Sequence, residues 1–202
     1  MPVNQDLHHL LRTRRSIRRF KADPIPDSVI ESILTTSTYA PSAHNRQPWR
    51  FAIVKQKARS LKSRLGLAIT SKMREDMQAE GAMDTDIEKR VNSSLRRIEE
   101  APLAIILCRD VEDVRVDTEQ EKVMGTQSVA SAGLQLLLAA HAEGLGGNWI
   151  CWPLYAPEAV RTVLDLPFSW EPQAMYFLGY PEEEPQIKER KSLNEIVKTF
   201  DD

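Results

Sequence analysis

The sequence has little of what several classes of protein require. Of its 202 residues only 2 are cysteine and 8 are glycine, aromatic residues make up 6%, and the formal net charge is −2. Cys108 and Cys151 stand apart in apolar surroundings, so we expect reduced, buried thiols and neither a disulfide nor a redox pair. A total charge this close to zero is unlike the basic surface of a general nucleic-acid binder. We therefore expect no nucleic-acid partner.

Long apolar runs are also missing. The longest, "LQLLLAAHA", is far short of the roughly 20 residues that a membrane span needs. The N-terminus has no apolar stretch followed by a small-residue cleavage site, so it does not resemble a secretory signal. We expect a soluble, cytoplasmic protein with no membrane partner. At 202 residues, 42% of them hydrophobic, the chain is long enough for one core and short for two, which predicts a single domain over residues 1–202.

Several catalytic motifs are absent too. There is no Walker-type phosphate loop, no G-x-S-x-G elbow and no H-E-x-x-H pair. The stretch "GLGGNW" differs from the G-x-G-x-x-G fingerprint and precedes a strand instead of joining a strand to a helix. The four histidines have no metal-ligand spacing with each other or with the cysteines. These absences argue against a nicotinamide-binding Rossmann domain and against a metal site.

The spacing of apolar residues predicts alternating helices and strands. Helices are expected over residues 3–13, from Pro26 with Asp27 as a candidate cap, over most of 58–100 with one glycine near the middle at Gly81, over 126–141, and over 156–164. Strands are expected at 49–54, 103–108, 146–152 and 173–180. The helix over 126–141 is apolar on nearly all sides and should be buried on most faces. The pattern is α/β or α+β, a small sheet wrapped by helices, and the polar tail from residue 186 should lie across a surface.

Three polar segments stand out against this background. "RTRRSIRRF" holds five arginines in nine residues and offers guanidinium forks suited to a phosphate. "APSAHNRQPWRF" is a polar turn before a strand, which can line a planar ligand. "EGLGGNW" has three glycines that let backbone come close to a ligand. Alone, each segment has an ordinary alternative, a solvated charged face or a simple turn.

In order and spacing these segments resemble the nitroreductase superfamily of FMN-dependent flavoproteins. The matching stretches are "RRSIR", "PSAHNRQPWRF", "APLAIIL", "GLQLLLAAHAEGLGGNW" and "RKSLNEIV". The resemblance covers nearly the whole chain. It implies an α+β nitroreductase-like fold and an intertwined homodimer with FMN at the subunit interface, in which the Thr126–His141 helix takes part.

The resemblance also implies which residues bind the cofactor. Those expected to contact the FMN phosphate and pyrimidine edge are Arg14, Arg15, Ser16, Arg18, Lys188 and Arg190. The residues expected to come from the neighbouring subunit, or to line the flavin ring, are Pro41, Ser42, Asn45 and Gln47. Those expected along the isoalloxazine near its reactive nitrogen are Leu145, Gly146 and Gly147. Arg12 and Arg19 fall outside the pattern and are expected to be ordinary surface charge. No side chain need act as an acid or base, because the flavin carries the electrons.

Within the superfamily, "APEAVRTVLDLP", "WEP" and "GYP" look most like the flavin-binding C-terminal domain of the enzyme that adds glutamates to the 5-deazaflavin coenzyme. The ligase domain of that enzyme has no counterpart here, so we expect no ligase activity. The turn also carries His44 and Arg46 where other members differ, which leaves the substrate face open.

Two hypotheses about function follow. The first is an FMN-dependent oxidoreductase that takes hydride from NADH or NADPH in a ping-pong reaction and reduces a nitroaromatic, a quinone or a related small acceptor. The alternative is a flavin- or deazaflavin-binding module with little reductase turnover of its own. The sequence does not choose between NADH and NADPH.

Overall fold

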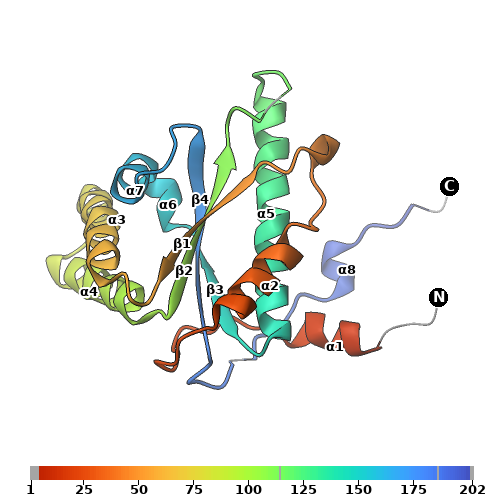
Figure 1. The fold of residues 1–202 in the computed structure, drawn as a ribbon, viewed down its shortest axis with the longest axis horizontal. Coiled ribbons are helices and arrows are strands. Elements are labelled where there is room, and N and C mark those ends of the chain that lie inside the picture. The colour runs from red at the N-terminus through yellow and green to blue at the C-terminus, as the bar shows by residue number, and fades with distance from the viewer. Residues whose placement is uncertain (1–4, 114, 186, 201–202) are drawn as a thin grey trace.

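The computed structural model describes residues 5–113, 115–185 and 187–200. In chain order the elements are α1 (Gln5–Thr13), α2 (Asp27–Ser37), η1 (Ala43–Asn45), β1 (Trp49–Lys55), α3 (Arg59–Ala79), α4 (Asp84–Glu100), β2 (Leu103–Asp110), α5 (Glu119–Ala142), β3 (Gly146–Ile150), α6 (Trp152–Tyr155), α7 (Pro157–Leu164), β4 (Trp170–Gly179) and α8 (Leu193–Ile196) (Figure 1). Each predicted helix and strand has a counterpart among the described residues, with ends shifted by up to seven residues, and residues 3 and 4 of the first predicted helix lie outside the described part of the chain. The α+β class is confirmed.

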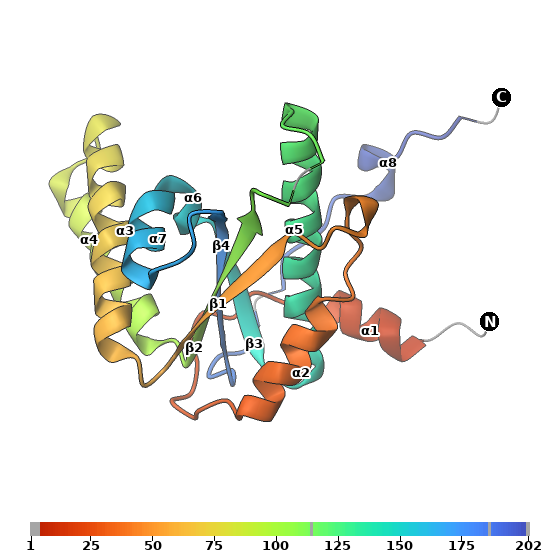
Figure 2. The ribbon, with the colours of Figure 1, turned by 45° about the horizontal axis from the view of Figure 1, so that its top comes forward.

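The strands form one antiparallel sheet in the order β1-β2-β4-β3. Strand β2 is central and buried from Leu103 to Arg109. Its continuous apolar run is explained by the helices on both faces of the sheet, because they cover the β2 side chains that point to either face. Figure 2 shows α5 and α2 on one face and α3, α4, α6 and α7 on the other.

Two hydrophobic cores result, one on each face of the sheet. Leu107 belongs to the core under α5, together with Leu136 and Tyr176, whereas its neighbour Ile106 belongs to the core under α3 and α4. This alternation follows from the two-residue period of a strand. The sheet is therefore a rigid wall, and the segments that border it are positioned by both cores.

Helix α5 begins seven residues before the predicted start at Thr126, at Glu119, because the Thr118 hydroxyl accepts a hydrogen bond from the Glu121 N–H and caps it. Its Gly133 allows close contact with the sheet: a Cβ there would lie 1.9 Å from the Tyr176 hydroxyl oxygen. Among the described residues α5 is the one helix that is long and apolar enough to cross a membrane. Its packing on the sheet accounts for that composition.

The expectation that this helix is buried on most faces is largely met within one chain, since of residues 126–141 only Thr126, Gln127 and Leu134 are exposed. The face toward the sheet is buried, but Leu134 on another face is 50% exposed. A helix with apolar residues on all sides is expected to be buried all round. The exposed face of α5 is therefore not covered by the rest of this chain.

Two smaller predictions also need correction. Asp27 does not cap α2: its carboxylate lies 2.6 Å from the Lys55 ammonium, and Pro26 occupies the cap position. Cys108 is buried in β2, where burial raises the pKa of its thiol to about 12, but Cys151 is exposed, since it precedes α6 at the end of β3. Both cysteines are free, as expected.

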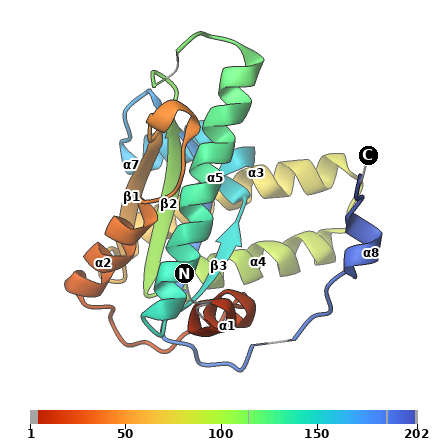
Figure 3. The same ribbon diagram turned by 90° about the vertical axis from the view of Figure 1, so that its right-hand side faces the viewer.

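The C-terminal tail is not laid across a surface of this chain. Its described residues from 187 to 200 are exposed throughout, including the apolar side chains of Leu193 and Phe200. Figures 1 and 3 show it running away from the body of the molecule. Its apolar residues are spaced too widely for a core strand, and they pack against no core in this chain.

Candidate cofactor site

The arginine segment between α1 and α2 is held along the edge of the sheet by one apolar residue. Ile17 is 5% exposed, and its N–H donates to the Gly147 carbonyl oxygen at 3.1 Å. Ser16 forms a parallel bridge with Gly147, and Phe20 forms an antiparallel bridge with Pro181. Because Ile17 points into the core, the polar residues beside it are left at the surface of the sheet edge.

A cavity of about 310 Å³ opens where this segment meets the C-terminal tail. We call it the arginine cavity. Its lining residues are Arg14, Arg15, Ser16, Arg18, Glu183, Glu184, Lys188 and Arg190. The fold thus brings together, from opposite ends of the chain, all six residues that the family resemblance implied for the phosphate and pyrimidine edge.

The positive charge in the arginine cavity is largely uncompensated. Among the described residues, the side chains of Arg14, Arg18 and Arg190 have no hydrogen bond or ion pair. Arg15 donates only to the carbonyl oxygens of Arg12 and Arg14, and its Nε is buried with no partner. Burial, followed by the charges of Arg15 and Arg190, lowers the pKa of Arg14. A cluster of this kind is suited to a multiply charged anion such as a phosphate.

Glu183 fixes the backbone of the segment. One carboxylate oxygen accepts hydrogen bonds from the N–H groups of Arg18, at 2.6 Å, and Arg19, at 3.2 Å, and the other accepts from Arg19 Nε at 3.1 Å. Burial raises the pKa of Glu183, but these hydrogen bonds outweigh it and hold the pKa below its usual value. Arg19 is therefore more than ordinary surface charge, since it anchors the carboxylate that holds the segment.

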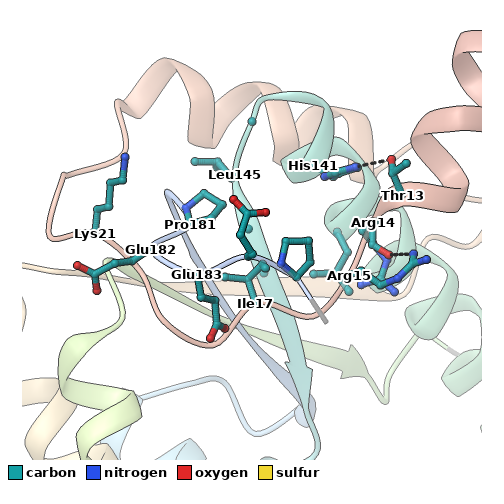
Figure 4. Close-up of a pocket in the computed structure, with 16 residues that line it drawn as sticks. Thr13, Arg14, Arg15, Ile17, Lys21, His141, Leu145, Pro181, Glu182 and Glu183 are labelled. Carbon is teal, nitrogen blue, oxygen red and sulfur yellow. Dashed lines mark hydrogen bonds between the residues drawn. The ribbon is translucent and has the colours of Figure 1, made fainter. Parts of the chain in front are cut away.

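A second cavity, of about 560 Å³, adjoins the first and shares Arg14, Arg15, Glu183 and Glu184 with it. We call it the glycine cavity (Figure 4). Gly146 and Gly147 line it, but both are needed for packing: a Cβ on Gly146 would lie 2.8 Å from Ile17, and one on Gly147 would lie 2.5 Å from Leu178.

The expectation that these glycines let backbone approach a ligand stays a prediction, and the structure adds a packing role. Their small size lets β3 approach the arginine segment and β4, while their backbone forms part of the cavity wall. The side chain of Leu145 is 2% exposed and belongs to the core. Of the glycines that line this cavity, Gly144, with a φ of +76°, is the one with open space around it, and it serves as the turn after α5.

His141 is a cavity residue that the sequence did not indicate. It lies in the last turn of α5, and its Nε2 is 3.1 Å from the hydroxyl oxygen of Thr13 (Figure 4). Burial lowers the pKa of His141, and the charges of Arg14 and His9 lower it further. A neutral imidazole thus stands at the edge of the positive cluster. The only signal in the sequence was a polar ring at the end of an apolar helix.

The polar turn before β1 lies elsewhere. None of the residues predicted in it, Pro41, Ser42, Asn45 and Gln47, lines either cavity. The turn contacts α5 near Ser128, whose hydroxyl oxygen is 3.1 Å from the Ala43 N–H. His141 is 13 residues further along the same helix, about 20 Å at 1.5 Å per residue. A single chain does not unite the turn with the arginines, and the prediction that it serves the neighbouring subunit remains a prediction.

The turn is also strained. His44, Asn45 and Gln47 have φ values of +53°, +52° and +56°, a region that costs a residue other than glycine roughly 1–2 kcal/mol. Its internal hydrogen bonds hold it: Ser42 Oγ accepts from the Gln47 N–H at 3.0 Å, and Asn45 Oδ1 accepts from Gln47 Nε2 at 3.2 Å. Strain that is held in this way is common at binding sites.

Comparison with known proteins settles the family. The chain matches the family model described as "Nitroreductase family" over residues 11–180. This protein belongs to the nitroreductase family. It is 32% identical over 191 residues to 5,6-dimethylbenzimidazole synthase of Rhodospirillum rubrum, covering 93% of this chain and 87% of the relative. It is 29% identical to an NADH dehydrogenase of Thermus thermophilus, covering 91% of each chain.

Solved structures agree with the fold. A BluB-like flavoprotein of Clostridium difficile has a TM-score of 0.78 at 24% identity, covering 98% of this chain and 100% of that one. The FMN-dependent nitroreductase NfnB of Mycobacterium smegmatis, in complex with NADPH, has a TM-score of 0.76 at 19% identity, covering 97% and 98%. The nitroreductase-like fold expected from the sequence is thereby confirmed.

Proposed function

We propose that this nitroreductase-family protein takes electrons from NADH or NADPH and passes them, in a ping-pong reaction, to a nitroaromatic, a quinone or a related small acceptor. Membership of the family makes it an FMN-dependent oxidoreductase. The single observation that supports the cofactor site is the arginine cavity, in which cations from both ends of the chain meet and outnumber the carboxylates.

The described residues suit FMN in charge and in hydrogen-bonding chemistry. Arg14, Arg190 and Lys188 would hold the phosphate, Ser16 would add a hydroxyl, and Arg18 would face the pyrimidine edge. FMN, when bound, supplies the hydride and electron chemistry. The chain supplies position and electrostatics, because fixed positive charge near the ring would stabilise the negative charge of the reduced flavin. No acid or base from the chain is needed.

We further propose that the working unit is a homodimer in the cytoplasm. The turn at residues 41–47 would then serve the site of the neighbouring subunit, together with the backbone of Gly146 and Gly147 from the first. The half-exposed Leu134 on α5 and the exposed apolar tail around Leu193 support an interface. Sedimentation should give about twice the mass of one chain, and a monomer that retains full activity would contradict this arrangement.

The test of the function is a visible spectrum of the purified protein followed by anaerobic titration with NADH and NADPH. We expect a flavin spectrum that bleaches with one donor or both and recovers on adding a nitroaromatic or quinone. Protein that stays colourless after FMN reconstitution, or bound FMN that neither donor reduces, would overturn the proposal. Because one relative is a 5,6-dimethylbenzimidazole synthase, the products of aerobic incubation should be searched for that compound.

The second candidate is a flavin- or deazaflavin-binding module. The segments "APEAVRTVLDLP", "WEP" and "GYP" support it, through their likeness to the flavin-binding domain of the deazaflavin glutamate ligase. Titration with the 5-deazaflavin coenzyme separates the two. Binding of the coenzyme with negligible NAD(P)H oxidation would favour the module, and brisk oxidation without binding would remove it.

A further inference from the structure

The hydrogen bonds of Thr13 fix the tautomer of His141. The Thr13 hydroxyl oxygen lies 2.9 Å from the His9 carbonyl oxygen and 3.3 Å from the Leu10 carbonyl oxygen, and a carbonyl can only accept. The hydroxyl proton is therefore directed at the backbone of α1. Because His141 Nε2 lies 3.1 Å from the same hydroxyl oxygen (Figure 4), the imidazole must donate there, and Nε2 carries the ring proton.

The other ring nitrogen, Nδ1, is left to bind a proton. Within the described part of the chain it has no hydrogen-bond partner, since the one hydrogen bond of the His141 ring is made by Nε2. A proton on Nδ1 turns the ring into an imidazolium and leaves the donation from Nε2 to Thr13 intact. His141 can therefore change its charge without changing its position.

Charged groups face this ring from three segments of the chain. Those on α1 and on the arginine segment are basic, whereas the carboxylates belong to the segment after β4. The titratable residues that line the glycine cavity with His141, or act on its charge, are His9, Arg14, Arg15, Lys21, Glu182, Glu183 and Glu184. Glu143, near the same end of α5, is engaged elsewhere, because its Oε1 accepts from the Ser32 hydroxyl at 2.8 Å.

The charge of Arg14 helps to keep His141 neutral. Burial lowers the pKa of His141, and the charges of Arg14 and then His9 lower it further. The C-terminal end of α5, where His141 lies, would by itself favour a cation. Arg14 lines both the glycine cavity and the arginine cavity. The neutral state of His141 is thus coupled to whether the charge of Arg14 is opposed by an anion.

An anion on Arg14 and Arg15 would reverse this balance, since a nearby negative charge favours the charged form of a histidine. We propose that His141 takes up a proton from solvent when the FMN phosphate binds in the arginine cavity, so that retention of the cofactor is linked to pH. This inference rests on the proposed function, which assigns the phosphate to Arg14. His141 takes no part in electron transfer.

The direction of the effect follows from linkage. The pKa of His141 is higher with the phosphate bound than without it, so between these two pKa values the bound state holds an additional proton. FMN should therefore bind more tightly as the pH falls through this range. The second ionisation of the phosphate itself, near pH 6, opposes the effect at lower pH. It is the same for every variant of the protein, so comparison between variants cancels it.

Proton uptake is measured by calorimetry of FMN binding in two phosphate-free buffers of different ionisation enthalpy, from about pH 5.5 to about pH 8.5. The wild-type protein should take up about half a proton more than His141→Gln where the two differ most, because a nearby opposite charge favours the charged form by about tenfold or more. The glutamine amide can still donate to Thr13. His8→Gln, which removes an exposed histidine of α1, is the matched control and should behave as wild type.

A lysine at the same position separates charge from structure. His141→Lys is charged throughout this range, so it should bind FMN about tenfold more tightly than His141→Gln at every pH. The affinity of the wild-type protein should match the glutamine variant at the alkaline end and approach the lysine variant at the acidic end. A ratio of wild-type to glutamine affinity that does not change with pH overturns the proposal.

Histidine-selective nitrogen NMR gives a readout that does not depend on affinity. The protein without FMN should show His141 protonated on Nε2, and loading with FMN should move its titration to higher pH. A proton on Nδ1 in the neutral ring, or a titration that FMN does not move, overturns the proposal. So does a difference in proton uptake between wild type and His141→Gln that is as large with riboflavin, which lacks the phosphate.

The outcomes separate this inference from the proposed function. If bound FMN is reduced by neither NADH nor NADPH, the oxidoreductase proposal fails, whereas the proton uptake at His141 is read from binding alone. If FMN is reduced normally but wild type and His141→Gln take up protons equally, the enzyme remains and the role assigned to His141 is wrong.

Discussion

Two places in this molecule hold cationic side chains, and they treat them differently. Lys62 of α3 is 1% exposed, and its ammonium donates to the carbonyl oxygens of Glu99 and Ala101 at the end of α4. The arginine cavity instead collects cations with no acceptor for most of their donors. Lys62 is satisfied within the chain and serves the fold, whereas the arginines are arranged for a group that the chain does not contain.

The largest effect should come from removing a cavity arginine. Arg14→Ala or Arg18→Ala should weaken FMN retention by about ten- to hundredfold, because each loses charge-assisted hydrogen bonds of roughly 1.5–3 kcal/mol. Thermal stability of the FMN-free protein should hardly change. The measurement is the FMN dissociation constant by fluorescence titration.

Arg12→Ala is the matched control for these variants. Arg12 is exposed and lines neither cavity of the cofactor site, and its backbone carbonyl, which accepts from Arg15, survives the substitution. Equal losses of FMN affinity in all three variants would mean that only overall charge matters, and the assignment of Arg14 and Arg18 would fall.

Lys62 should show the reverse pattern. Lys62→Met keeps the apolar volume but leaves two α4 carbonyl groups without their donor, so we expect a loss of about 1–3 kcal/mol in the free energy of unfolding. The FMN affinity of the folded protein should stay the same. Urea denaturation measures the first and fluorescence titration the second, with exposed Lys57→Met as the control. A Lys62 variant that folds normally but releases FMN would contradict the distinction between a structural lysine and ligand-binding arginines.

The pH dependence of stability sharpens the same contrast. Burial lowers the pKa of Lys62 to about 8, whereas an unfolded lysine titrates near 10.4. Between these values the unfolded chain binds more protons than the native one, so this lysine makes stability rise with pH. From pH 7 to 9.5 its share should be about 1–2 kcal/mol, measured as the difference between wild type and Lys62→Met. A difference that is constant over this range would contradict the lowered pKa.

Local patterns in the sequence predicted most of the fold. Apolar runs such as Leu103–Cys108 form strands that are buried on both faces, and a strand buried in this way needs apolar residues throughout. Gly81 lies between two helices, at a φ of +78° that suits glycine. The sequence missed the seven residues before Thr126 in α5, since the Thr118 cap is a single side chain in a polar stretch.

The candidate site was predictable only in part. The family resemblance grouped Arg14 with Arg190, and the fold brings them into one cavity. It gave no hint of Lys62 or Glu183, because charged residues on helices or in an acidic run have the same local pattern whether they are solvated or buried at a site. Only the tertiary arrangement decides which of them loses its water.

The smallest effect should come from Glu183, whose carboxylate both positions the arginine segment and opposes an anionic ligand. Glu183→Gln keeps an oxygen that can accept from the Arg18 N–H but removes the negative charge, so the two consequences nearly cancel and FMN affinity should change by no more than about threefold. Glu183→Ala removes the acceptor as well and should weaken binding more, because the segment then loses the contact that holds it at 2.6 Å. Titration of both variants at low and high salt separates charge from position. If the alanine and glutamine variants behave alike, Glu183 acts through charge alone and the arginine segment is held by Ile17.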